Sequence, residues 1–178
     1  MFNLSRAMQA IDEVMGARPS GLELTWNTPV QYDPDLLRSL ITDYDDLNIR
    51  FDVLVRRVEL DPALAERAVL ECADRLHKLR HVESLKLYPV IARGLSPDPI
   101  ARRLFWQSRL VTLGLARRAL RRFDELARAV RTRTEVAAAA EHAATALLEY
   151  RRRNEATMFP LYTAVGRRLA PAAKSQVA

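Results

Sequence analysis

The amino-acid sequence predicts an all-α protein: an up-down-up-down antiparallel four-helix bundle with an N-terminal helix and an extended strap. Ala, Leu, Arg and Glu dominate the composition, and all four are good helix formers. The 178 residues include only five glycines. Four segments carry apolar residues at alternating three- and four-residue spacing, which is typical of helices with one buried face. The connections between these segments are short, so consecutive helices are expected to be antiparallel neighbours.

Residues 1–31 are expected to precede the bundle as a separate segment. Residues 3–15 have the spacing of a short amphipathic helix, and Gly16 is suited to end it. Residues 17–32 contain the helix-breaking residues of this region and are predicted to form an extended strap. The simplest interpretation is that the strap packs on the bundle with Trp26 as its anchor, and a detachable partner-binding arm is the alternative.

The predicted bundle covers residues 32–168, and its first two helices each begin at a proline that follows an aspartate. Asp33-Pro34-Asp35 opens the first helix and Asp61-Pro62 opens the second, because proline is favoured in the first turn and carboxylates are favoured near the N-terminus. The predicted inward positions of the first helix are Leu37, Leu40, Tyr44, Leu47, Phe51, Leu54 and Val58. Those of the second are Ala65, Val69, Cys72, Leu76, Leu79, Glu83 and Val90.

A segment rich in proline and glycine, residues 93–99, separates the second helix from the third. The third helix is predicted to end near Arg131, and the fourth to follow Thr134 and to be kinked by Pro160. The predicted inward positions of the third helix are Trp106, Arg109, Leu113, Ala116, Leu120, Phe123, Ala127 and Val130. Those of the fourth are Val136, Ala140, Ala143, Leu147, Tyr150, Asn154, Thr157 and Leu161. Residues 169–178 are expected to be a flexible tail.

Composition also indicates where the protein works. No apolar run approaches the roughly 18 residues that a membrane-spanning helix needs, and the N-terminus lacks the apolar core of a signal peptide. The single cysteine, Cys72, excludes an internal disulfide and suits a reducing compartment. A cytoplasmic location without a membrane span is therefore expected.

Charge is distributed unevenly between the two halves of the chain. Residues 1–95 hold 12 Lys and Arg against 15 Asp and Glu, and residues 96–178 hold 16 against 7. The favoured interpretation is that an acidic helix pair packs on a basic one. The alternative is a nucleic-acid or anionic-surface interface on the arginines of the basic half, at positions 117, 118, 121, 122 and 151–153. That half lacks a recognised nucleic-acid motif, so this alternative is not favoured.

Five polar residues interrupt the predicted inward faces: Tyr44, Glu83, Arg109, Tyr150 and Asn154. Counted from the helix ends at a rise of about 1.5 Å per residue, all five fall in one layer of an antiparallel bundle. Such a layer is either a metal site or a hydrogen-bonded network. A di-iron site needs several carboxylates and imidazoles, but this layer supplies one carboxylate, one amide, two phenols and a guanidinium. The guanidinium cannot bind a metal, and its fixed positive charge would repel one. We therefore predict a metal-free network with a buried Glu83–Arg109 ion pair.

A metal, if present, is expected on Glu83 with Tyr44, Tyr150 and Asn154. His77 and His81 are one helical turn apart, which is metal-ligand spacing, but they are predicted to face away from Glu83. They are weaker, surface candidates for zinc or haem contact. No cofactor is expected, with non-haem iron or haem as the alternative.

The same positions resemble those of hemerythrin-like (HHE cation-binding) domains. Residues 32–36 followed by residues 43–47 are similar to the opening of that family, in which an Asp-His pair supplies a ligand; here Tyr44 stands at the histidine position. The second family helix carries His-x-x-x-Glu, followed six residues later by a proline that an aromatic residue precedes. Glu83, Tyr88 and Pro89 fit this frame, while Leu79 replaces the histidine.

The later helices continue the resemblance with further replacements. Tyr150 and Asn154 stand at the family's His and Glu positions before Phe159-Pro160, and Arg109 stands where some members have a carboxylate. The resemblance covers about residues 32–165. It implies the fold, and it implies di-iron binding and sensing of oxygen, nitric oxide or iron only for members that keep the ligands.

The expected function is therefore a non-catalytic regulatory or protein-interaction module that has lost its di-iron site. Its expected partner is another protein, with a second copy of the chain as one option. The alternative is an atypical metal- or haem-binding sensor. An enzyme is not expected, because no nucleophile triad, phosphate loop or paired carboxylate is found.

Overall fold

The computed structural model of the chain describes residues 31–57 and 62–169. These residues form helices joined by short connections, with no β-strand among them, so the predicted all-α class is confirmed for this part of the chain. The predicted N-terminal helix (3–15), the strap as far as residue 30 and the tail from residue 170 lie outside the described residues.

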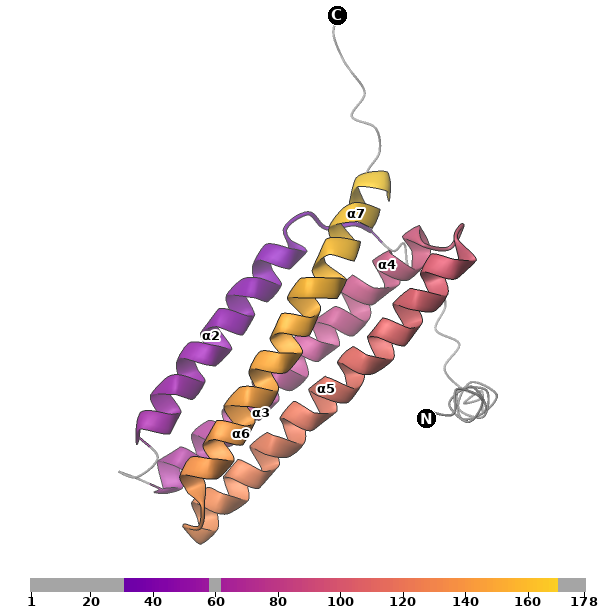
Figure 1. Cartoon of the computed structure of the whole chain (residues 1–178). Coiled ribbons are helices and arrows are strands. Elements are labelled where there is room, and N and C mark those ends of the chain that lie inside the picture. The colour runs from indigo at the N-terminus through magenta and orange to yellow at the C-terminus, as the bar shows by residue number, and fades with distance from the viewer. Residues whose placement is uncertain (1–30, 58–61, 170–178) are drawn as a thin grey trace, which may run out of the picture.

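Two of the long helical segments each contain a wider, π-helical turn. In chain order the elements are α2 (Leu36–Arg57), α3 (Pro62–Val82), η1 (Glu83–Leu87), α4 (Tyr88–Gly94), α5 (Pro99–Thr132), α6 (Val136–Arg153), η2 (Asn154–Met158) and α7 (Phe159–Leu169). The segments α3–η1–α4 and α6–η2–α7 are continuous, and with α2 and α5 they lie side by side in Figure 1.

The core lies between these four segments. α5 packs on α3 and α6, and α2 packs on the same two helices, so α2 and α5 lie diagonally across the molecule (Figure 1). α4 packs on α7 at one end. The chain enters α2 at this end, where the Tyr32 and Tyr162 rings lie 5.1 Å apart and the Tyr162 hydroxyl donates to the Asp33 carbonyl oxygen at 2.9 Å.

The predicted inward faces of the first two helices are confirmed. On α2 the buried positions include Leu40, Tyr44, Leu47, Phe51 and Leu54, and on the second segment they include Ala65, Val69, Cys72, Leu76, Leu79, Glu83 and Val90. At the start of α2, Leu36 is buried in place of the predicted Leu37, which is half-buried. The predicted Val58 lies outside the described residues.

The inward face of α5 was predicted as two rows of residues, each with a spacing of seven, and one of these rows is shifted by one residue in the structure. Ala116, Phe123, Ala127 and Val130 are buried as predicted, but Trp106 is 39% exposed and Leu113 and Leu120 are half-buried. The buried residues of the second row are Phe105, Thr112, Ala119 and Leu126. The reason is close packing, because α6 presents buried alanines to α5, and small side chains on α5 let the two helices approach closely.

The π-helical turns change the register after Glu83 and Asn154. In each, a backbone N–H bonds the carbonyl five residues earlier: Tyr88 bonds Glu83, and Phe159 bonds Asn154. Pro89 and Pro160 follow these donors, and a proline cannot donate to the carbonyl four residues earlier, so a wider turn accommodates it. The extra residue moves the buried positions of the last segment to Met158 and Tyr162, instead of the predicted Thr157 and Leu161.

Candidate functional site

A completely buried carboxylate, that of Glu83, lies at the centre of the candidate site. Its Oε1 accepts hydrogen bonds from the Tyr44 hydroxyl at 2.7 Å and from Asn154 Nδ2 at 3.1 Å. Its Oε2 accepts from the Tyr88 hydroxyl at 3.2 Å and from the Tyr150 hydroxyl. A carboxylate offers about four acceptor sites, so these four donors occupy all of them. We call Glu83, Tyr44, Tyr88, Tyr150 and Asn154 the polar layer.

Every long segment except α5 contributes to the polar layer. Tyr44 comes from α2, Tyr150 from α6 and Asn154 from the first position of η2. Asn154 Nδ2 also lies 3.0 Å from the Tyr44 hydroxyl oxygen, which ties the network together across α2 and η2. The Tyr44 and Tyr150 rings pack edge to face, with centroids 6.0 Å apart. The polar layer is therefore held from several helices at once.

Tyr88 was not expected in the polar layer, and the π-helical turn explains its presence. In an ordinary α-helix with 3.6 residues per turn, a residue five positions on lies about 140° round the axis and could not reach Glu83. The wider turn η1 brings Tyr88 back over Glu83, so their side chains bond although they are only five residues apart. The sequence signal that could have located Tyr88 is the proline that follows it.

The predicted ion pair between Glu83 and Arg109 is wrong. Within residues 31–57 and 62–169, no salt bridge or hydrogen bond joins the two side chains. The guanidinium carbon of Arg109 instead lies 5.0 Å from the centre of the Tyr88 ring and 4.8 Å from that of Trp106. The one-residue shift of α5 is the physical reason, since it turns Thr112 fully into the core and leaves Arg109 half-buried at the edge.

We expect the substitution Arg109→Leu to lower the free energy of unfolding by only about 1 kcal/mol. It removes two cation–π contacts at a half-buried position but leaves all four donors of Glu83 in place. Urea unfolding measures the change, and Arg103→Leu, at an exposed position of the same helix, is the control. A loss of about 3 kcal/mol or more would contradict this assignment and would indicate a buried ion pair.

Burial raises the pKa of Glu83, and the hydrogen bonds from Tyr150, Tyr44 and Tyr88 and the charge of Arg80 only partly oppose this effect. Burial and the neighbouring Glu83 charge also raise the pKa of Tyr44 and of Tyr150. The phenols therefore stay protonated and remain donors. Charge balance in the polar layer depends on the protonation of Glu83 alone.

The raised pKa of Glu83 predicts how stability depends on pH. The folded protein holds this proton more tightly than the unfolded chain, so the free energy of unfolding falls as pH rises from the ordinary glutamate pKa, about 4.3, through the raised one. Glu83→Gln should remove this contribution, and Glu71→Gln, at an exposed position of α3, should not. Urea unfolding over a pH series tests it, and parallel profiles for the parent and Glu83→Gln would contradict it.

The polar layer does not fit a di-iron centre. Glu83 is its only carboxylate, and four protein donors already occupy the oxygens that a metal would need. No group of three His, Cys, Asp or Glu side chains that could hold a metal occurs in the described part of the chain. His77 and His81 lie at exposed positions of α3, away from the layer, as predicted. The Asn154 Oδ1 atom is buried without a hydrogen-bond partner, but one neutral oxygen does not make a metal site.

A small cavity of about 20 Å³ adjoins the polar layer and is lined by Glu83, Tyr88, Arg109, Thr112, Tyr150 and four further residues. This volume is enough for about one water molecule. It is far smaller than the several hundred Å³ of an ordinary small-molecule pocket. The cavity can therefore hydrate the edge of the layer but cannot hold a substrate beside Glu83.

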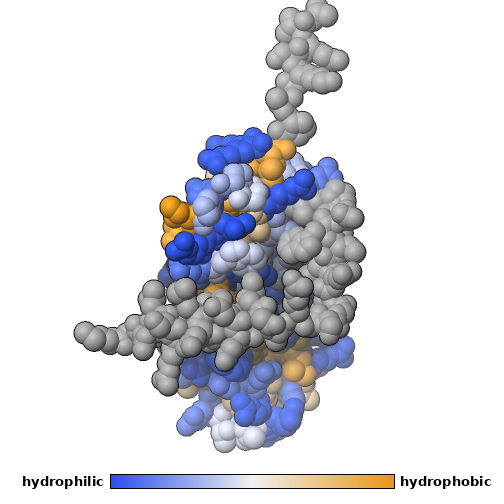
Figure 2. Space-filling model, turned by 90° about the vertical axis from the view of Figure 1, so that its right-hand side faces the viewer, coloured by the Kyte–Doolittle hydropathy of each residue, from blue (hydrophilic) through white to orange (hydrophobic). Residues whose placement is uncertain are grey.

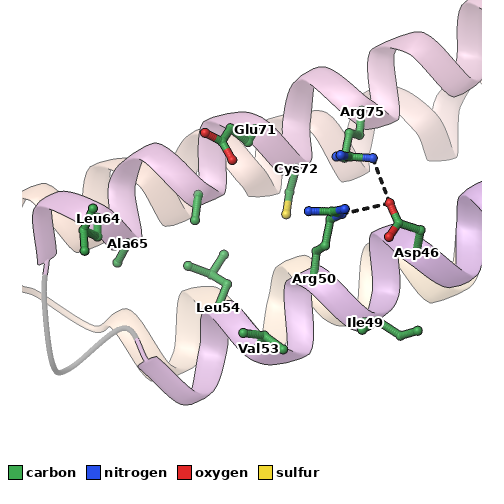
Figure 3. Close-up of a pocket in the computed structure, with 11 residues that line it drawn as sticks. Asp46, Ile49, Arg50, Val53, Leu54, Leu64, Ala65, Glu71, Cys72 and Arg75 are labelled. Atoms are coloured by element: carbon green, nitrogen blue, oxygen red, sulfur yellow. Dashed lines mark hydrogen bonds and ion pairs between the residues drawn. The ribbon is translucent and has the colours of Figure 1, made fainter.

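A larger groove of about 860 Å³ lies between α2 and α3 and is separate from the polar layer (Figure 3). At one end, Arg50 Nε and Arg75 Nη1 both bond Asp46 Oδ2 at 2.8 Å. Cys72 lies along the groove, and burial raises the pKa of its thiol to about 11, so it stays protonated and unreactive near neutral pH. The small side chains Ala65 and Ala68 on α3 leave the groove open.

Comparison with protein-family models, with curated proteins and with solved structures found no match for the chain. Among the residues that the structure describes, no helix is long and apolar enough to cross a membrane.

Proposed function

We propose that the chain is a hemerythrin-like domain, folded as an up-down-up-down antiparallel four-helix bundle, that works as a non-catalytic regulatory or protein-interaction module. In this proposal a hydrogen-bonded polar layer stands where metal-binding members of the family carry their di-iron centre. The expected partner is another protein or a second copy of the chain.

One observation carries the proposal: the single carboxylate of the layer has all its acceptor sites filled by protein donors. A residual or weakened metal site would leave lone pairs directed at a common point. Here they are directed at three phenols and an amide instead. Buried polar groups that are fully satisfied fix the relative positions of the helices that carry them. These contacts therefore support a structural role for the polar layer. Such a role suits a module that binds its partner through its outer surface.

The helix contacts support the bundle arrangement. α5 follows α4 after a four-residue connection, Leu95–Asp98, and packs against α3, while α6 follows α5 after a three-residue connection and packs against it. Connections this short leave consecutive helices no room to run parallel. The two π-helical turns, each before an aromatic-Pro pair, lie at the positions on which the family resemblance rests.

The metal content of the purified protein tests the proposal. We expect protein made in iron-replete medium to contain no stoichiometric iron by elemental analysis and to have no visible absorption band. Stoichiometric iron, or a visible band lost in Tyr44→Phe and in Glu83→Ala, would overturn the proposal in favour of a metal- or haem-binding sensor. His77→Ala with His81→Ala is the matched control, because both histidines lie outside the polar layer.

A further inference from the structure

The outward side of α5 combines exposed apolar side chains with unpaired arginines. Its first half carries five large apolar residues with exposed fractions of 39–67%: Ile100, Leu104, Trp106, Leu110 and Val111. At 100° per residue, Ile100, Leu104 and Val111 lie within about 40° of one another and roughly 80–140° round the helix axis from the buried Phe105 and Thr112. These side chains therefore lie on an exposed flank of α5, beside its buried side.

The same side of α5 is also basic along its length. α5 contains nine arginines against Asp124 and Glu125, a net charge of +7 on one helix. Arg118 and Arg122 are paired with Glu149 and Glu125. Other arginines of α5 are exposed and have no ion pair within the described ranges: Arg102, Arg103, Arg117, Arg121 and Arg128. We call these five arginines and the five apolar residues the α5 outer surface.

The structure narrows the set of arginines that sequence reasoning put forward for polyanion binding. Arg151 is paired with both Asp45 and Glu155, and only 18% of its side chain is exposed. Arg153 donates to the Ser108 hydroxyl at 3.0 Å. Arg152 is exposed and has no ion pair within the described residues, and the other unpaired arginines of the predicted set, Arg117 and Arg121, lie on α5. Figure 2 views the molecule from the side on which α5 lies in Figure 1 and shows hydrophobic areas set among hydrophilic ones.

We propose that the α5 outer surface binds an anionic lipid bilayer. The unpaired arginines favour a negatively charged partner. The exposed apolar residues favour a partner that has accessible apolar material beneath its charged surface, as a lipid bilayer has. A nucleic-acid duplex offers no such apolar layer to these side chains. Leu104 and Val111 enter the boundary between headgroups and acyl chains, Trp106 lies at the level of the headgroups, and Arg117 and Arg121 bind the anionic headgroups. The surface is the convex side of one helix, so it offers no groove in which a partner helix could lie. This inference goes beyond the proposed function and does not depend on the polar layer.

Vesicle co-sedimentation of the full chain tests this inference. We expect binding to phosphatidylcholine vesicles that contain phosphatidylserine, little binding to phosphatidylcholine alone, and weaker binding as salt increases. Arg117→Gln with Arg121→Gln should weaken binding by roughly thirtyfold, about fivefold for each arginine near the surface. Leu104→Ser with Val111→Ser should also weaken it by at least about tenfold, because two apolar side chains no longer leave water.

The matched controls lie on α2, diagonally across the molecule from α5. Ile49→Ser with Val53→Ser removes exposed apolar residues there, and Arg56→Gln removes an exposed arginine, so neither should change vesicle binding. All substituted positions are exposed, and circular dichroism checks that the variants stay folded.

Absence of binding to phosphatidylserine vesicles would overturn the proposal, as would equal effects of the α5 and α2 substitutions. Binding to short DNA duplexes that is lost with the arginines but not with Leu104 and Val111 would assign the surface to nucleic acid instead. Self-association that requires Leu104 and Val111, without vesicle binding, would assign it to a second copy of the chain.

Discussion

Replacing Glu83 with alanine is expected to lower the free energy of unfolding by about 4 kcal/mol. The substitution removes the common acceptor of Tyr44, Tyr88, Tyr150 and Asn154, so several buried donors lose their partner in a place that water barely reaches. It also leaves space at a position with no exposure at all. Urea unfolding monitored by circular dichroism measures the loss.

Two further variants separate the hydrogen-bonding role of Glu83 from the loss of any glutamate in this segment. Glu83→Gln keeps one carbonyl oxygen as an acceptor, and a phenol hydroxyl can rotate to accept from the new amide, so its cost should be about 1–2 kcal/mol. Glu71→Ala removes an exposed glutamate that is paired with Arg67, and its cost should stay below about 1 kcal/mol. If Glu83→Ala cost no more than Glu71→Ala, the layer would have to be hydrated.

Most of the helical pattern could be predicted from the sequence, because it follows from local signals. Proline near the start of α3 and α5, and alternating three- and four-residue spacing, determine where a helix begins and which side it buries. α2 and α3 show this clearly, since predicted inward residues such as Leu47 and Leu76 are completely buried, even though α2 also carries exposed apolar residues such as Ile49.

The orientation of α5 could not be predicted, because two adjacent rows of residues both carry apolar side chains. The sequence alone favours the row that contains Trp106 and Leu113, because its apolar side chains are larger. Close packing on the alanines of α6 selects the row that contains Thr112 and Ala119. That choice depends on a neighbouring helix that lies elsewhere in the sequence, so periodicity within α5 cannot reveal it.

The same limit accounts for the one error within the predicted site. Tyr44, Glu83, Tyr150 and Asn154 were each located by interruptions of an apolar pattern, and the structure brings them together. Arg109 met the same criterion but is half-buried at the edge of the core. Tyr88 takes part although ordinary helical geometry excludes it, because a π-helical turn alters the angle between it and Glu83. A proline pattern can raise the expectation of such a turn but cannot set its width.

The substitution Asn154→Asp is expected to cost about 4 kcal/mol near neutral pH, although it changes one NH₂ group to an oxygen. Asn154 Nδ2 lies 3.1 Å from Glu83 Oε1 and 3.0 Å from the Tyr44 hydroxyl oxygen, so a carboxylate oxygen would replace a donor beside an existing carboxylate. No cation contacts either position within the described residues. Two like charges this close cannot both ionise, so one carboxyl must take up a proton at the expense of stability.

The pH dependence of this loss distinguishes charge repulsion from a change of shape. In mildly acidic solution the new carboxyl is protonated and can donate to Glu83 as the amide does, so most of the loss should disappear. Asn154→Leu removes the same donor without adding charge, and its cost should change much less with pH. Gln107→Glu adds a carboxylate at an exposed position of α5 and should change stability by less than about 0.5 kcal/mol.

Equal losses for Asn154→Asp at neutral and acidic pH would contradict the assignment of Asn154 as a donor to Glu83. In the proposed relationship to hemerythrin-like domains, this position corresponds to a glutamate, and the variant tests why an amide suits the polar layer: the amide supplies a donor where a second carboxylate would need a cation.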